Sequence, residues 1–233
     1  KAFAMKGAKA IALAINSPGG SPVQSALIHD RIRLLADEKM MPVYVFCEDV
    51  AASGGYWIAC AGDEIYTAET SIIGSIGVIA ATFGFEEAIK KLGVERRLFT
   101  AGSKKSLLDP FLPVEEADFK RLSSLQKEIH ENFKQHVRTR RDGRLKASER
   151  KLFTGEFWTG AKALDLGLTD GIGDLKSVLQ KKFGEKVRLP VVGADKSWLQ
   201  RRFGLATQLS SMGLPSDLLA AAEVRAHWAR YGL

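Results

Sequence analysis

The stretch VYVFCEDVAASGG, residues 43–55, ends in a glycine-rich turn, and the stretch AKAIALAINSPGG, residues 8–20, has the same design. In each, a short apolar run leads into a tight turn, as buried strands of a parallel sheet do. After the first turn, residues 21–38 place apolar side chains at helical intervals, with Ser21 at the capping position and Pro22 in the first turn. This alternation of strand, turn and helix predicts an α/β fold with a largely parallel sheet.

Outward from these two turns, the pattern predicts further elements. Residues 56–60 are typical of a short helix and residues 64–67 of a strand. The apolar stretch at 72–81 is broken by Gly74 and Gly77, which predicts a strand with close backbone approach. The remaining expected elements are a helix at 86–92, a strand at 95–100, a long amphipathic helix at 115–141, a compact glycine-rich cap at 153–174 with a short helix at 161–166, and a final helix near 217–230.

The apolar face of the long helix is expected to pack on the sheet or on a neighbouring subunit. Its members recur at steps of three and four residues and are Leu122, Leu125, Ile129, Phe133 and Val137.

The composition fits a folded α/β protein of 233 residues, with 45% hydrophobic and 26% charged residues. The net charge of +7 arises largely in residues 138–151, where seven Arg and Lys residues gather. No aromatic residue interleaves with this run, so it offers no stacking platform for bases. We interpret it as a solvated basic surface and expect no nucleic-acid partner.

The two cysteines, Cys47 and Cys60, lie in apolar stretches without the spacing of a metal site. They are expected to be small buried side chains, and no metal or cofactor is predicted. No run of about 18 apolar residues occurs, so no transmembrane segment is expected in this sequence, and the compartment is left open.

The two glycine-rich turns are also the candidate chemical site. Turns of this kind direct backbone N–H groups outward at a helix N-terminus, where an anion can be held. If Ser53 attacks a carbonyl group, the amides of Gly54 and Gly20 could stabilise the oxyanion. One Gly-Gly pair alone would be an ordinary turn, but two such turns flanked by small residues favour a site with room for a substrate.

A nucleophilic serine needs a base, and histidine is the usual one. No histidine occurs between His29 and His130, and a surface role is the simpler interpretation for all four histidines. Lysine can serve where burial or positive charge lowers its pKa. Lys104 and Lys105 lie in a loop at the expected active-site end of the sheet, and the pattern does not choose between them.

Five motifs in a fixed order resemble the signal peptide peptidase A family, peptidase family S49. They are INSPGG, AASGGYWIA, ETSIIGSIGVI, AGSKKSLLDPF and FTGEFWTGAKALDLGLTDGIGDL, and the resemblance that they carry runs from about residue 8 to residue 174. The resemblance implies a ClpP/crotonase-like fold with repeated ββα-type units, and a serine endopeptidase with a Ser-Lys dyad. It also implies extended hydrophobic peptides, such as cleaved signal peptides, as substrates, hydrolysed through an acyl-enzyme.

Carried over to this sequence, the resemblance implies Ser53 as nucleophile, Lys105 as base and Ser75 as a residue that orients the lysine. Gly20 and Gly54 would form the oxyanion hole, and Lys104 would have no catalytic role. The stretch from residue 74 to 80 resembles the strand on which a peptide substrate pairs by β-addition. Its implied substrate-binding residues are Gly74, Ile76, Gly77 and Val78.

The resemblance further implies a homo-oligomer in which adjacent protomers supply the serine and the lysine of each site. Residues 1–192 are expected to form the catalytic domain, without the N-terminal strand or hairpin usual in the family. Residues 193–233 are expected to form a C-terminal helical appendage. The family often has a membrane anchor, so membrane association is left open.

Three other functions compete with this interpretation. A crotonase-like acyl-CoA enzyme uses the same pair of turns with acidic residues, but it needs no serine at the second turn. A ClpP-type protease would require a Ser-His-Asp triad, against which the gap in histidines argues. A non-catalytic scaffold of the same fold is the third alternative.

Overall fold

The computed structural model describes residues 1–102, 104–193, 225, 228–229 and 231. The chain begins with a short 3-10 helix, η1 (Ala2–Ala4), and then alternates strands and helices. The strands are β1 (Ile11–Ser17), β2 (Val43–Ala52), β3 (Glu64–Thr67), β4 (Ile72–Gly74), β5 (Phe157–Thr159) and β6 (Gly171–Ile172). The helices are α1 (Pro22–Lys39), α2 (Gly54–Ala59), α3 (Glu86–Lys91), α4 (Glu116–Arg140), α5 (Glu149–Leu152), α6 (Gly160–Leu166) and α7 (Leu175–Phe183).

The sheet is largely parallel, as predicted. Its order is β5-β4-β2-β3-β6, and β1 pairs with β2 beside this path. Every pairing is parallel except that of β4 with β5. The long β2 is the organising strand: its first half pairs with β1 and β3, and its last three residues pair with β4. The candidate nucleophile follows directly at its end.

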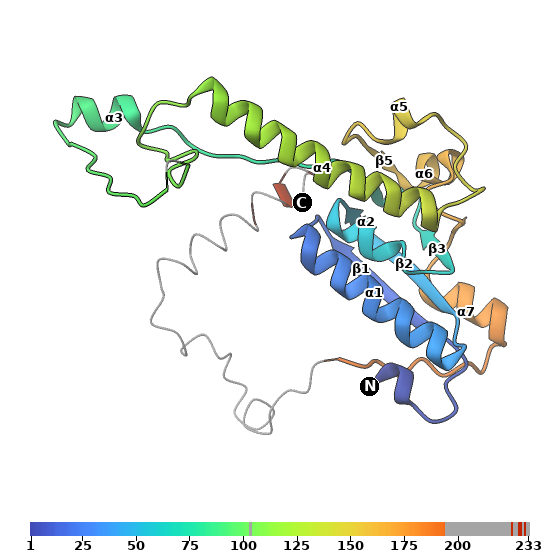
Figure 1. The fold of residues 1–233 in the computed structure, drawn as a ribbon. Helices are drawn as coiled ribbons and strands as arrows, with labels where there is room; N and C mark the ends of the chain where they lie inside the picture. Colours follow the sequence, from blue (N-terminus) through green and yellow to red (C-terminus); the bar gives the residue numbers. More distant parts are fainter. Residues whose placement is uncertain (103, 194–224, 226–227, 230, 232–233) are drawn as a thin grey trace.

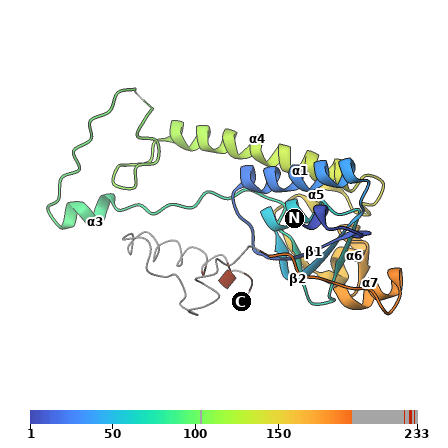
Figure 2. The same cartoon turned by 90° about the horizontal axis from the view of Figure 1, so that it is seen from below.

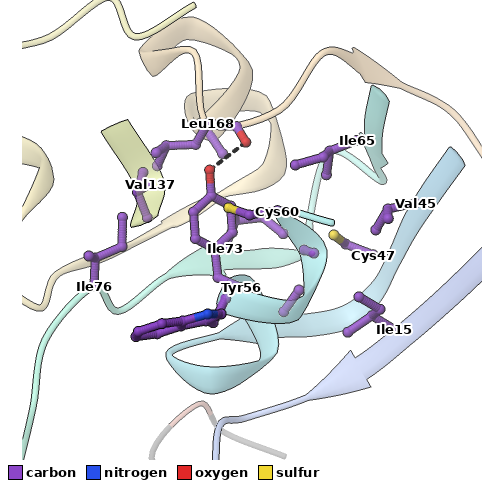
Figure 3. Close-up of a cluster of buried hydrophobic side chains, with 14 of the residues drawn as sticks. Ile15, Val45, Cys47, Tyr56, Cys60, Ile65, Ile73, Ile76, Val137 and Leu168 are labelled. Carbon is purple, nitrogen blue, oxygen red and sulfur yellow. Dashed lines mark hydrogen bonds between the residues drawn. The ribbon is translucent and has the colours of Figure 1, made fainter. Parts of the chain in front are cut away.

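Helices cover the two faces of the sheet unequally. Figure 2 shows α1 and α4 on one side of the sheet and α7 on the other. On the α1 and α4 side lies the main core, and Figure 3 shows how the Tyr56 ring enters its centre, where the hydroxyl donates to the Leu168 carbonyl at 2.7 Å. Cys47 and Cys60 are free thiols in this core, as expected. Burial raises the pKa of both, that of Cys60 to about 12, so neither is a ready nucleophile.

Two strand predictions between residues 72 and 100 are wrong. The strand expected at 72–81 ends at Gly74, and the one expected at 95–100 is absent from the described residues. Gly74 has φ 114° and Ser75 has φ 51°, and this turn takes the chain off the sheet. Beyond it the apolar pattern has no neighbouring strand to pair with, so the third βα unit does not form as the first two do.

Residues beyond about 80 project from the body instead. Figures 1 and 2 show α3 and the chain on either side of it extending away from the sheet, with α4 leading back. The projection has exposed apolar side chains, among them Phe83, Leu92 and Phe99. Of the predicted apolar face of α4, Phe133 and Val137 are buried, whereas Leu125 and Ile129 are exposed. The reason is that only the C-terminal part of α4 lies on the sheet.

The interpretation of residues 138–151 as a solvated surface is wrong for Arg141, which is 1% exposed. Its guanidinium donates to both carboxylate oxygens of Asp170 and to the Gly167 carbonyl. Asp170 in turn accepts from the Ile65 amide, so the arginine ties α4 to the edge of β3. A run of basic residues does not indicate which of them is buried, because the acidic partner of the buried arginine, Asp170, is distant along the chain.

Within the described part of the chain, no helix has both the length and the apolar character needed to span a bilayer. The helix predicted near 217–230 lies mostly outside the described residues, although Arg225, Trp228 and Ala229 are helical.

Candidate active site

Ser53 occupies the sharp junction between β2 and α2. Its φ of 52° and ψ of −121° are unusual for a residue with a side chain, and such a backbone costs on the order of 1–3 kcal/mol. The junction is held from both sides, because the Ser53 amide donates to the Gly74 carbonyl at 2.8 Å and its carbonyl accepts from Trp57. The half-buried side-chain hydroxyl has no hydrogen bond to any described residue. The turn therefore presents an uncommitted hydroxyl on a rigid support.

The structure brings the two glycine-rich turns into contact, as their shared design predicts. A Cβ atom on Gly19 would lie 3.1 Å from the Cβ of Ser53, and one on Gly54 would lie 3.1 Å from the Gly20 nitrogen. The Cβ on Gly54 would also lie 2.5 Å from the Ser25 hydroxyl oxygen. A side chain at either position would push the turns apart, so glycine is required for this approach.

Gly20 and Gly54 both present amides without acceptors among the described residues. The Gly54 amide is free because it lies in the first turn of α2, where no preceding helical carbonyl exists. Two free N–H groups next to an uncommitted hydroxyl form an arrangement that can hold the oxyanion of an acyl-transfer intermediate.

Ser75 also lies near the site, one residue beyond the carbonyl that anchors Ser53. It is 7% exposed, and its amide donates to the Glu156 carbonyl at 2.7 Å. Its hydroxyl forms no hydrogen bond within the described residues. Ser75 and Ser53 thus come together through Gly74, and each has a left-handed backbone and an available hydroxyl.

The four residues expected to bind substrate differ in whether their backbone groups are free to pair with a peptide. Gly74 is paired with β2 on one side and β5 on the other, so its strand has no free edge there. The Ile76 side chain is fully buried in the core, and its carbonyl accepts from His130. The Gly77 amide donates to Ser75, whereas both backbone groups of Val78 are free of partners among the described residues.

Lys105 is not brought to Ser53 within one chain. It lies in the segment between α3 and α4, and Figure 1 shows this segment in the projection, apart from the start of α2. The Lys105 side chain is exposed and forms no ion pair with the described residues, and its amide donates to Gly102. Lys104 is exposed in the same loop.

The surface role expected for the histidines is wrong for His29, which is 6% exposed, and His136 is only partly exposed. In each of the three described histidines, one ring nitrogen already contacts a polar atom of the protein. His136 hydrogen-bonds the Trp57 carbonyl at 3.1 Å, and burial lowers its pKa to about 4. His29 contacts Asp30 at 2.8 Å, and burial lowers its pKa as well. His130 is held by the Ile76 carbonyl at 3.0 Å. His227 lies outside the described residues.

Sequence reasoning missed Ser25 and Tyr231. Ser25 is buried where α1 passes Gly54, and a small residue one turn into the helix after a glycine-rich turn is the signal that could have indicated it. Tyr231 lies against the strand ends beside the site, and nothing local in the sequence indicates that long-range contact. No group of three or more potential metal ligands occurs among the residues that the structure describes.

A serine on a strained strand-to-helix turn, between two free glycine amides and on a largely parallel sheet, defines the class of serine peptidases with a ClpP-like fold. Comparison with known proteins supports this class. Residues 36–187 match peptidase family S49, and the chain belongs to that family.

Named relatives include peptidases of a bacterium and a plant. The chain is 34% identical to protease 4 of Haemophilus influenzae over 179 residues, which are 74% of this chain and 28% of that protein. It is 33% identical to the chloroplastic serine protease SPPA of Arabidopsis thaliana over 175 residues, 73% of this chain and 25% of that protein.

A higher identity, 52% over 241 residues, relates the chain to a protein of Brucella abortus named Na⁺/H⁺ antiporter NhaA. All of this chain aligns, but it spans only 33% of that protein's length. The aligned third of the Brucella protein therefore resembles a family S49 domain, and the alignment does not extend to the remaining two thirds.

Proposed function

We propose that this chain is a Ser-Lys endopeptidase that hydrolyses extended hydrophobic peptides, such as cleaved signal peptides, through an acyl-enzyme on Ser53. The observation that best supports this is the uncommitted Ser53 hydroxyl beside the free amides of Gly20 and Gly54. In the reaction, the Ser53 oxygen attacks the peptide carbonyl while its proton passes to the base. The amine then leaves with a proton, and water hydrolyses the ester.

Lys105 is the proposed base, supplied by an adjacent copy of the chain. Three features support this arrangement: the Lys105 segment is remote from Ser53 within one chain, its side chain is exposed, and the projection has exposed apolar side chains. Phe83 is 78% exposed and Phe99 is 92% exposed, which is costly unless another surface covers them. A homo-oligomer would bury such side chains and deliver the lysine in the same contact.

Ser75 is proposed to orient the incoming lysine through its unpartnered hydroxyl. Substrate backbone is proposed to pair at Gly77 and Val78, where the chain has left the sheet and Val78 has free backbone groups. Gly74 and Ile76 would then hold the start of this segment in place. Gly74 does so by pairing with β2 and β5, and Ile76 does so through its buried side chain.

The assignment of the base is tested with fluorogenic hydrophobic peptides and three single variants. Lys105→Ala should abolish hydrolysis, whereas Lys104→Ala and His130→Gln should retain it. Circular dichroism checks that each variant is folded. Retained hydrolysis in Lys105→Ala, with loss in Lys104→Ala or His130→Gln, would contradict the assignment.

Sharing of the site between copies is tested by mixing inactive chains. Ser53→Ala and Lys105→Ala chains should each be inactive, but an equal mixture that exchanges subunits should recover about a quarter of the parent activity. The reason is that random neighbours pair an intact serine with an intact lysine at one site in four. A mixture that exchanges subunits and stays inactive would contradict sharing.

Labelling of Ser53 by a fluorophosphonate distinguishes a serine peptidase from a non-catalytic scaffold of the same fold.

A further inference from the structure

Arginine side chains bind all four backbone carbonyls of residues 60–63, the connection between α2 and β3. Arg140 of α4 donates to the first and the third of these carbonyls, at 2.7 and 3.3 Å. Arg33 of α1 donates to the second at 3.1 Å, and Arg144 donates to the fourth at 2.9 Å. Figure 1 shows α2 beside both α1 and α4. The helix that begins next to Ser53 is therefore fixed at its other end by side chains from two neighbouring helices.

Arg140 differs from the other arginines of this cluster because it has no carboxylate partner. The ion pairs of the cluster are those of Arg33 with Asp37 and Asp63, and those of Arg141 and Arg144 with Asp170. Arg140 forms no ion pair with any residue that the structure describes, and its guanidinium is bonded to carbonyls. Four guanidinium groups thus face three carboxylates, which leaves the cluster with a net charge of +1.

The surroundings of Arg140 make its charge effective over a distance. Its side chain is partly buried, and burial lowers its pKa, with the nearby Arg33 acting in the same direction. Residues 60–62, whose carbonyls it contacts, are buried. A guanidinium stays charged in such a place, and the charge is screened less there than on an open surface.

The short helix α2 joins this charge to the proposed oxyanion site. Residue 60 follows Ser53 by seven residues, so a helical rise of about 1.5 Å per residue places the guanidinium roughly 13 Å from the nucleophile. At an effective dielectric constant of about 20, a unit charge at that distance stabilises an anion enough to change a rate roughly tenfold. Bound substrate carries no such anion, so the effect is confined to the transition state.

We propose that Arg140 is a positioning residue of the acyl-transfer site. It fixes α2 through two carbonyls and keeps an uncompensated positive charge behind the amides of Gly20 and Gly54. The inference rests on the function proposed above, because without acyl transfer at Ser53 there is no oxyanion to stabilise.

The test measures how fast a fluorophosphonate labels Ser53 in the full chain, because an oxygen on phosphorus gains negative charge in that step. Arg140→Gln should be labelled about tenfold more slowly than the parent. Arg140→Lys keeps the charge and a donor, so its rate should stay within about twofold of the parent rate. Arg138→Gln is the matched control: it lies on the same helix, but Glu131 and Glu149 already neutralise its charge, so labelling should be unchanged.

Hydrolysis of a fluorogenic peptide separates this role from a merely structural one. Arg140→Gln should lower kcat about tenfold and leave KM nearly unchanged. Equal losses in Arg140→Lys and Arg140→Gln would overturn the electrostatic role, as would parent-like labelling of a folded Arg140→Gln chain. A parent chain that is never labelled and hydrolyses no peptide would instead contradict the proposed peptidase, and this inference with it.

Asp37→Asn decides the question if circular dichroism shows that Arg140→Gln does not fold. Asp37 is an exposed partner of Arg33, so its replacement leaves Arg140 in place and removes one of the three carboxylates. The added positive charge should speed labelling of Ser53 by up to about twofold, since solvent screens this position. Labelling of a folded Asp37→Asn chain that is no faster than labelling of the parent would overturn the proposal.

Discussion

Acid should destabilise this fold through a pair of histidines packed behind α2, of which His29 is buried and His136 is partly buried. His29 of α1 and His136 of α4 meet edge to face, with ring centroids 4.3 Å apart, and His136 also stacks on Trp57 of α2. The charged groups that face the pair are Asp30 and Arg33 of α1 and Arg140 of α4. Asp30 favours a proton on the rings, but burial and the two arginines oppose it, so both imidazoles are held neutral.

The size of the stability loss at acid pH follows from the lowered pKa of His136. Its pKa falls from an ordinary 6.5 to about 4 because burial disfavours the charged ring. The unfolded chain therefore binds the proton first as pH falls. The stability from this group is fully present above the unfolded pKa and is lost as pH falls from about 6.5 toward about 4. The full loss is about 3 kcal/mol, of which about 2 kcal/mol is gone by about pH 5. His29 adds to the loss in the same direction.

The assay is urea unfolding at about pH 8 and about pH 5, followed by circular dichroism, for the parent and for His136→Gln. Glutamine can keep a hydrogen bond to the Trp57 carbonyl but has no proton to gain. The parent should lose about 2 kcal/mol more than the variant between the two pH values. Carboxylates contribute equally to both chains and cancel in the comparison. His130→Gln, on the same helix but outside the pair, is the matched control. An equal pH dependence in the parent and His136→Gln would refute the reasoning.

Two other predictions concern close contacts near the site. Gly54→Ala keeps the amide N–H, but its Cβ would lie 2.5 Å from the Ser25 hydroxyl oxygen and 3.1 Å from the Gly20 nitrogen, so it should displace both proposed oxyanion donors. We expect hydrolysis to fall by up to about 100-fold and stability by about 1–3 kcal/mol. Adding Ser25→Ala should restore part of the stability in urea unfolding; an alanine at residue 54 with full activity would contradict the proposed oxyanion hole. Tyr56→Phe should cost about 1–3 kcal/mol, since it leaves the buried Leu168 carbonyl without its donor, and an unchanged unfolding midpoint would contradict this.

The parts of the fold that sequence predicted are those fixed by local chemistry. The two glycine-rich turns were placed correctly because an apolar strand, a glycine pair and a helix follow each other without interruption in each. The two turns come into contact because they follow β1 and β2, which are neighbouring parallel strands. The boundaries of β3 and α3 were close to those expected for the same reason. Ser53 was a candidate because it is a serine on a glycine-rich turn and because its small neighbours leave space around it.

The parts that sequence could not predict depend on distant residues. The apolar stretch after Gly74 resembles a strand, but no neighbouring strand is available to pair with it. Arg141 lies in a basic run, yet it is buried because Asp170 meets it from another part of the chain. The choice of Lys105 over Lys104 rested on resemblance, and the structure leaves both exposed on the projection.

The backbone of Ser53 has a consequence for the history of this gene. Glycine would adopt a φ of 52° without the strain that a serine there imposes, so folding alone favours glycine at this position. If Ser53 is the nucleophile, only selection for its hydroxyl keeps the side chain in place. In a duplicated copy freed from that selection, mutation would tend toward glycine here. A glycine after the two alanines of this turn would then identify a descendant that kept the fold and abandoned the chemistry.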